Sequence, residues 1–199
     1  MQACEIRDRL VQPWVHGDLV SLAGVTCEGL LDLSDCDVTG FDLSGAVFPD
    51  GINARNARFK GVSRFTESKF VNQACFSGSQ FAFDADFQGT KFHCPLDFSH
   101  VELRGIGRFN SAQFSDGMDF SACLFYGNLS LSHVQIDRHC DFHAAQFLGG
   151  LWCDHAKFPQ NSDFSDTEVH GRLWIRSAMI ENTPLSDTVF TLSFGYTYL

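Results

Sequence analysis

The chain has 199 residues and a formal net charge of −10, with 24 Asp and Glu against 14 Lys and Arg. An acidic surface repels nucleic acid and favours basic proteins as partners, so direct nucleic-acid binding is not expected. No apolar run reaches about 18 residues, which argues against a membrane-spanning segment. The first residues, Met1 to Arg7, lack the apolar core of a signal peptide. We therefore expect a cytoplasmic protein.

The first part of the chain is predicted to contain one short helix, at residues 3–12, which stops at Pro13. No Lys or Arg lies between Leu10 and Ala54, although this window holds seven acidic residues. We single out four of them as a surface for a basic partner: Asp32, Asp35, Asp37 and Asp42. The alternative is that this charge serves only solubility and prevents end-to-end aggregation.

From Phe59 to Ile180, large apolar residues recur at alternating spacings of six and five. All 23 positions of this ladder are apolar, and 16 of them are Phe. A mostly small residue, such as Ala57 or Ser63, lies two positions before each. The residues between are rich in Ser, Gly, Asn, Asp and Thr, which favour turns over helix interiors. The repeat therefore predicts short extended sides joined by corners, with the large and the small residue of each side both pointing inward.

The units 46–50 (AVFPD), 57–61 (ARFKG), 85–89 (ADFQG) and 112–116 (AQFSD) resemble the pentapeptide-repeat family, and the resemblance extends from Leu22 to Phe190. The family motif is a small residue, any residue, Leu or Phe, and two polar residues. The resemblance implies an all-β fold, a right-handed quadrilateral β-helix with Phe or Leu stacked inside. Here one coil would take about 22 residues rather than 20, with the extra residue absorbed at two corners.

A column of glycines marks one of these corners, and we attribute it to backbone angles that other residues resist. Phe83 interrupts the column. Its members are Gly61, Gly105, Gly127, Gly149 and Gly171. The predicted organisation is an N-terminal cap at residues 1–21, a β-helix at 22–190 and a terminal segment at 191–199. A cap is expected because an open solenoid end exposes apolar surface.

Residues 22 apart are predicted to stack on the outside of the helix. One side then carries a column of aspartates, which we call the aspartate column: Asp97, Asp119, Asp141 and Asp163. Like charges on adjacent strands repel one another, so they need water, a counter-ion or a partner. Either the column binds a basic protein, or the motif simply tolerates Asp at an exposed position.

The stretch His139-Cys-Asp-Phe-His143 sends His139, Asp141 and His143 outward together, and imidazoles beside a carboxylate can bind a divalent metal. The alternative is three exposed polar residues with the histidines balancing the aspartates. His133 and His155 are a weaker pair on another side. The eight cysteines form no CxxC pair and are expected as reduced thiols. Signatures of enzymes are absent, and no cofactor is expected.

Some members of the family resemble duplex DNA in shape and charge and occupy the DNA-binding saddle of type II topoisomerases. The resemblance therefore implies a non-enzymatic interaction module, with DNA gyrase or topoisomerase IV as one partner. The alternatives are a passive structural scaffold or a metal-dependent activity at the histidines.

The terminal segment offers Leu192, Phe194, Tyr196 and Tyr198, and no charged side chain follows Asp187. Such an apolar segment is not expected to remain disordered in water. It either folds over its own last coil or forms a two-fold dimer with a second copy. The resemblance favours the dimer, because DNA-mimicking members pair through their C-terminal ends.

Overall fold

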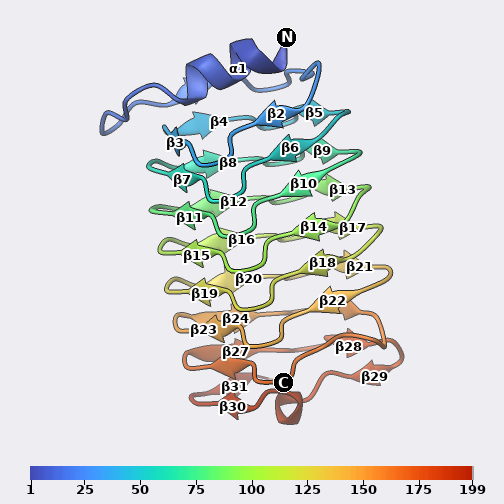
Figure 1. Ribbon diagram of the computed structural model, residues 1–199. Coiled ribbons are helices and arrows are strands. Elements are labelled where there is room, and N and C mark those ends of the chain that lie inside the picture. Colours follow the sequence, from blue (N-terminus) through green and yellow to red (C-terminus); the bar gives the residue numbers. More distant parts are fainter. Residues whose placement is uncertain (199) are drawn as a thin grey trace.

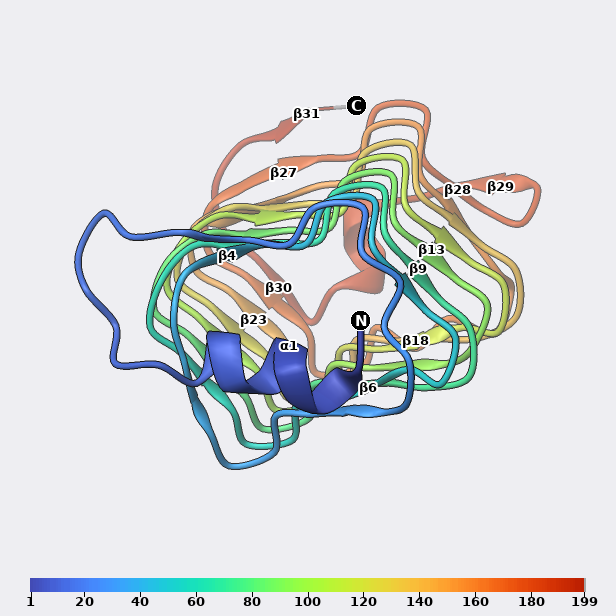
Figure 2. The same cartoon turned by 90° about the horizontal axis from the view of Figure 1, so that it is seen from above.

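The computed structural model describes residues 1–198, and these form a four-sided β-helix (Figure 1). Most sides of a coil are strands of two or three residues, and neighbouring strands of a sheet pair in parallel except for the antiparallel pair β28 (Met179–Ile180) and β29 (Thr183–Pro184). Seen from the N-terminal end, the chain runs clockwise as it recedes (Figure 2), so the helix is right-handed. The predicted fold class is thereby confirmed.

We number the four sheets I to IV in the order in which the chain visits them within a coil. Sheet I contains β2 (Leu31–Asp32), β6 (Ile52–Asn53), β10 (Ala74–Cys75), β14 (Leu96–Asp97), β18 (Met118–Asp119) and β22 (Cys140–Asp141). Sheet II contains β3 (Asp37–Val38), β7 (Arg58–Phe59), β11 (Gln80–Phe81), β15 (Glu102–Leu103), β19 (Leu124–Phe125), β23 (Gln146–Phe147), β26 (Glu168–Val169) and β30 (Leu192–Ser193).

The other two sheets lie opposite these. Sheet III contains β1 (Val20–Ser21), β4 (Phe41–Asp42), β8 (Ser63–Arg64), β12 (Ala85–Asp86), β16 (Gly107–Arg108), β20 (Leu129–Ser130), β24 (Gly150–Trp152), β27 (Arg172–Trp174) and β31 (Thr197–Tyr198). Sheet IV contains β5 (Val47–Phe48), β9 (Lys69–Phe70), β13 (Lys91–Phe92), β17 (Gln113–Phe114), β21 (Gln135–Ile136), β25 (Lys157–Phe158), β28 (Met179–Ile180) and β29 (Thr183–Pro184).

The strand register confirms the predicted length of a coil, since Leu96 pairs with Met118 and Phe92 with Phe114. The ladder side chains fill the interior as stacked rings. Phe98 and Phe120 lie in one column with ring centroids 5.0 Å apart, and both are fully buried. Burial of each such ring contributes on the order of 2 kcal/mol, so the ladder is the main source of stability.

Our explanation of the glycine column is wrong. None of its five glycines has a positive φ. A Cβ on Gly127 would lie 2.1 Å from the carbonyl oxygen of Gly105, and one on Gly149 would lie 2.4 Å from the carbonyl carbon of Gly127. Glycine is required because successive coils touch at this corner. Most positive φ values occur at the two corners without an extra residue, and there residues such as His133 and Ser111 adopt them.

Helix α1 (Ala3–Leu10) covers the first coil, as Figure 1 shows. It is shorter than the predicted range, because the N–H of Val11 already closes the last turn on the carbonyl of Arg7. Its apolar side buries Ile6 and Leu10 completely. The helix thus shields the apolar end of the stack from water.

Residues 191–198 were predicted to lie outside the repeat, but in the structure they extend it. After the antiparallel pair β28–β29, the short 3-10 helix η1 (Asp187–Val189) leads to the buried Phe190, whose ring lies 5.4 Å from that of Phe164. The chain then adds one more strand each to sheets II and III, as β30 and β31. Phe194 and Tyr196 remain 71% and 78% exposed at this end.

The eight cysteines are free thiols, and six of them are buried. Cys123, Cys140 and Cys153 occupy interior positions, where a thiol acts as a small apolar group. Burial raises the pKa of Cys94 to about 11 and those of the three interior thiols further. These groups are therefore packing residues and not nucleophiles.

Replacing Phe120 by Ala should lower the free energy of unfolding by about 3–5 kcal/mol, because it leaves a cavity among closely packed rings. Urea denaturation followed by circular dichroism measures this loss. The control is Tyr126→Ala, whose side chain is exposed and whose loss should cost less than about 0.5 kcal/mol. Equal costs at the two positions would contradict the interior ladder.

Candidate functional site

The aspartate column runs down sheet I, as predicted. Strand pairing places Asp97 beside Asp119 and Asp119 beside Asp141, and an isolated bridge places Asp141 beside Asp163. Neighbouring strands lie about 4.8 Å apart, so four carboxylates stand in line on one face. The same column continues toward the N-terminus through Cys75, Asn53 and Asp32.

One oxygen of each carboxylate is used to hold the following corner. Oδ1 of Asp119 accepts a hydrogen bond from the backbone N–H of Ser121 at 2.8 Å, and Oδ1 of Asp141 accepts one from that of His143 at 2.7 Å. Asp97 and Asp163 make the same contact and also accept from a serine hydroxyl. Short polar side chains commonly bond in this way to the backbone two residues on.

Asp at this position therefore has a structural role, which was not predicted from the sequence. The hydrogen bonds from Ser165 lower the pKa of Asp163, which keeps this carboxyl ionised. The second oxygen is free for a partner: among the described residues, nothing donates a hydrogen bond to Oδ2 of Asp119, Asp141 or Asp163. Oδ2 of Asp97 faces the thiol of Cys75 at 3.4 Å and a guanidinium nitrogen of Arg55 at 3.9 Å.

The four acidic residues of the N-terminal region do not form one surface. Asp32 lies on sheet I, Asp37 on sheet II and Asp42 on sheet III, while Asp35 occupies a corner. They are separated because the chain turns a corner every five residues here. Asp37 is also paired with Arg58 and with the ammonium of Lys60. The four carboxylates therefore face different sides of the β-helix, and their binding to a basic partner stays a prediction.

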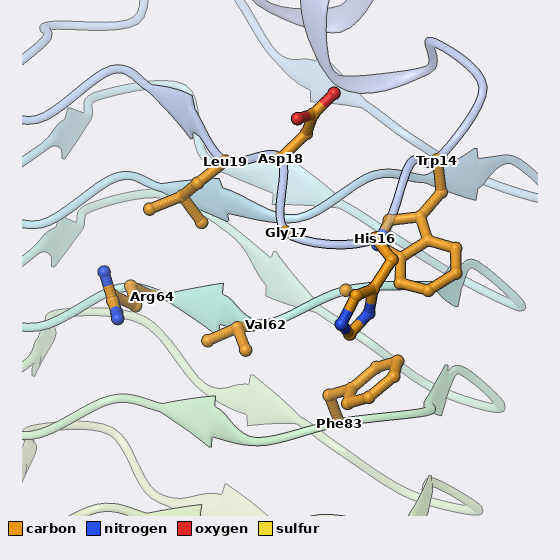
Figure 3. Close-up of a pocket in the computed structure, with 9 residues that line it drawn as sticks. Trp14, His16, Gly17, Asp18, Leu19, Val62, Arg64 and Phe83 are labelled. Carbon is orange, nitrogen blue, oxygen red and sulfur yellow. The ribbon is translucent and has the colours of Figure 1, made fainter.

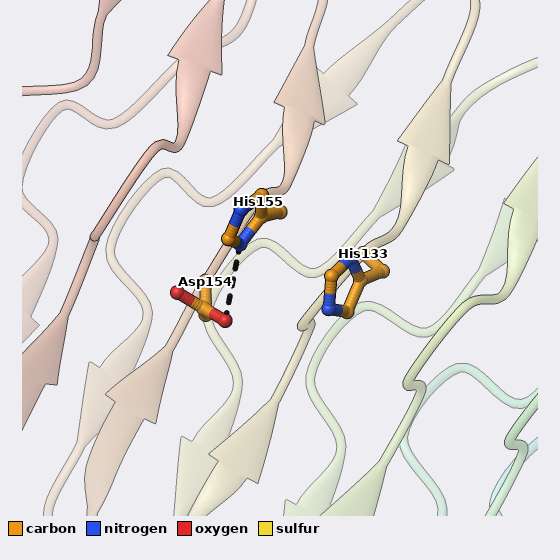
Figure 4. Close-up of side chains that lie close together, drawn as sticks. All are labelled: His133, Asp154 and His155. Carbon is orange, nitrogen blue, oxygen red and sulfur yellow. Dashed lines mark ion pairs between the residues drawn. The ribbon is translucent and has the colours of Figure 1, made fainter.

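The structure gathers metal-ligating atoms at a different place from the predicted one. Of residues 1–198, three offer ligand atoms that all lie within 4.8 Å of one another, namely His133, Asp154 and His155 (Figure 4). His139, Asp141 and His143 form no such group among these residues. The three side chains face outward as predicted, but two of them are engaged in other contacts. Asp141 accepts a hydrogen bond from the backbone N–H of His143, and Nδ1 of His143 faces the hydroxyl of Ser165 at 2.9 Å.

A cavity of about 270 Å³, which was not predicted from the sequence, lies between the N-terminal loop and sheet III (Figure 3). Trp14 and Phe83 form its aromatic wall, with ring centroids 5.8 Å apart, and Arg64 lines it too. Phe83 is the residue that interrupts the glycine column, and its side chain turns outward to contact Trp14. That interruption was the sequence signal for this contact.

Sheet III also carries an outward aromatic column near the C-terminus. Trp152 pairs in register with Trp174, and Trp174 with Tyr198, whose ring stacks on it at 4.2 Å. A cavity of about 260 Å³ lies between Trp152, Trp174 and the ion pair of Asp154 with Arg176. Hydrogen bonds from Arg176 lower the pKa of Asp154, so this carboxyl is ionised.

Comparison with known proteins identifies the class. The model of the family described as Pentapeptide repeats (9 copies) matches residues 22–69 and 54–102, and the same ladder continues in the structure to Ile180. Residues 22–102 thus match the pentapeptide-repeat family, and the fold of the described residues is that of a pentapeptide-repeat β-helix. No curated protein and no solved structure matches it. Within the part of the chain described here, no helix is long and apolar enough to cross a membrane.

The corner role of the aspartates can be tested at Asp119. Asp119→Ala removes the acceptor for the N–H of Ser121 and should cost about 1 kcal/mol of unfolding free energy. Asp119→Asn keeps an oxygen acceptor and should cost clearly less, since Asn53 occupies the same column naturally. Chemical denaturation of both variants measures the difference. If both cost the same, the hydrogen bond does not hold the corner.

Proposed function

We propose that this protein is a non-enzymatic interaction solenoid whose aspartate column binds a basic protein surface. The observation that carries the proposal is the line of in-register carboxylates on sheet I, each with Oδ1 bound in its own corner. These side chains are already ordered, so binding would cost little further entropy. Their mutual repulsion is unfavourable, and a row of Lys or Arg side chains on a partner would relieve it.

A charge estimate supports a partner that normally contacts DNA. Eight coils at about 4.8 Å each make a rod about 38 Å long. The net charge of −10 then amounts to one negative charge per roughly 4 Å of this rod. One strand of duplex DNA carries a charge about every 3.4 Å, and the two strands together carry one about every 1.7 Å. The rod thus has the sign of charge of DNA and a linear charge density close to that of one of its two strands.

A type II topoisomerase, DNA gyrase or topoisomerase IV, is the partner class we propose. This choice rests on the family and on the charge of the rod, because no individual residue of the chain selects such an enzyme. Binding would be competitive with DNA, since both anions would occupy the same basic groove. It would also weaken as the salt concentration rises, because the contacts are charge pairs at an exposed surface.

The binding test uses purified gyrase in a pull-down, together with a supercoiling assay. The informative variant changes all four residues of the aspartate column to Asn, which removes four charges and keeps the corner acceptors. We expect the wild-type chain to inhibit supercoiling near stoichiometric amounts and this variant to require at least tenfold more. Wild-type inhibition only at large molar excess would contradict specific mimicry.

The matched control removes an equal number of negative charges, four, from other exposed positions. Glu67, Asp137, Asp166 and Glu181 are exposed and lie outside the column, so their amide variants provide it. Inhibition should be nearly unchanged in this control. If both quadruple variants weaken equally, net charge and not the column is responsible. If neither the wild type nor the control binds, the passive scaffold is the better description.

We also propose that two copies pair through their C-terminal ends. Four apolar or aromatic side chains are exposed there, namely Leu192, Phe194, Tyr196 and Tyr198. The strands β30 and β31 of this segment nevertheless pair with the preceding coil. Only two of the four sheets receive a strand from this segment, so the end of the stack is incompletely covered. A second copy related by a two-fold axis would bury these rings in an isologous contact.

Removing the rings tests the dimer without removing the strands. Phe194→Ser with Tyr196→Ser leaves the backbone bonds from Phe194 to Val169 and from Leu173 to Tyr196 in place. The full chain should sediment near twice 22.2 kDa, and the double variant at the monomer mass. Sedimentation of the wild type as a monomer at high micromolar concentration would rule out the dimer.

A further inference from the structure

The coil repeat brings two histidines together at one corner of the helix. His133 and His155 occupy the same position in successive coils and follow the strands β20 and β24 of sheet III. Both adopt the left-handed conformation of this corner, with φ of 58° and 56°. Their imidazole rings are stacked with centroids 4.9 Å apart and planes 18° from parallel. The stacking follows from the strand spacing, so the two rings stay neighbours.

A carboxylate is fixed beside these rings. Asp154 precedes His155, and its Oδ2 lies 3.1 Å from Nδ1 of that residue (Figure 4). Arg176, one coil further on, donates from Nε to Oδ1 at 2.8 Å and from Nη2 to Oδ2 at 3.2 Å. The carboxylate is mostly covered, with its side chain 18% exposed, whereas that of His155 is 47% exposed.

We infer that His133, Asp154 and His155 bind a divalent transition-metal ion such as Zn²⁺, a site distinct from the proposed interaction surface. Two imidazoles and one carboxylate are a ligand set that suits zinc, nickel and copper. Arg176 would act as the outer partner that orients the ligating carboxylate, in the way that hydrogen-bonded outer residues do in metal sites.

The geometry requires only a small adjustment. The three ligand atoms lie within 4.8 Å of one another. A tetrahedral zinc ion about 2.0–2.1 Å from each ligand needs them roughly 3.4 Å apart. Exposed histidine side chains can rotate to close that difference at a cost of about 1 kcal/mol. Asp154 would exchange its contact with Nδ1 of His155 for the ion.

Three protein ligands leave one tetrahedral position open, which is typical of sites that accept a water or a small ligand. Asp154 also lines the cavity of about 260 Å³ between Trp152 and Trp174. This cavity offers space beside Asp154 for a molecule bound to the ion. The indoles also provide a spectroscopic probe, because Asp154 shares this cavity with two of the three tryptophans of the chain, so copper bound there would be near them.

The test is calorimetric titration of Zn²⁺ into the chelator-treated full-length protein. We expect one equivalent to bind the wild type. His133→Ser with His155→Ser should lower the affinity at least about tenfold. Serine is the matched replacement, since Ser111 and Ser177 occupy the same corner in the adjacent coils with φ of 58° and 55°. Circular dichroism and thermal melting should show that the variant folds.

The control is His100→Ser, which alters an exposed histidine at another corner with φ of 57°. It should bind Zn²⁺ as the wild type does. Cu²⁺ should quench part of the tryptophan fluorescence in the wild type and in this control, but not in the double-serine variant. Absence of Zn²⁺ binding to the wild type, or equal affinity in the double-serine variant, would overturn the inference. A similar loss in the control would indicate non-specific binding and would overturn it too.

Discussion

The stacking of one coil directly on the next, in register, is the constraint on which the rest of this structure depends. Each strand has only two or three residues, so a single coil cannot bury its large side chain without its neighbours. Rings such as Phe98 and Phe120 therefore contact each other across coils. The same spacing favours glycine at the corner where the backbones meet, as Gly105 and Gly127 show, although Phe83 occupies the equivalent position in one coil.

Side chains on the outside of the molecule are also arranged in columns, because a residue and its counterpart one coil later are neighbours. Aspartates at one position become the aspartate column on sheet I, and tryptophans at another become the aromatic column on sheet III. A structural and a functional role can coexist at such a position. Oδ1 of Asp119 holds a corner, while Oδ2 keeps its charge available to a partner. Substitution by Asn separates the two roles.

The two proposed activities use different parts of the helix. Sheets I and III lie opposite each other in the coil (Figure 2), so the aspartate column and the cavity beside Trp152 face away from each other. A protein partner on one side would leave the histidine corner accessible. The N-terminal loop adds a third feature on sheet III, because Trp14 and Phe83 enclose a cavity there.

The four-sided coil was implied by the resemblance to the pentapeptide-repeat family, whereas the period of the ladder by itself determined short extended sides joined by corners, because large residues at alternating spacings of six and five do not fit one face of a helix. It also determined which residues face outward and which stack, including the aspartate column. Tertiary structure alone decided how neighbouring columns meet at a corner. His133, Asp154 and His155 converge, whereas His139, Asp141 and His143 do not, because side-chain directions at a corner depend on its backbone angles and on the bonds made there. The tertiary structure likewise distributes Asp32, Asp37 and Asp42 over three sheets, because a corner at every fifth residue places residues that are close in sequence on different sides of the coil.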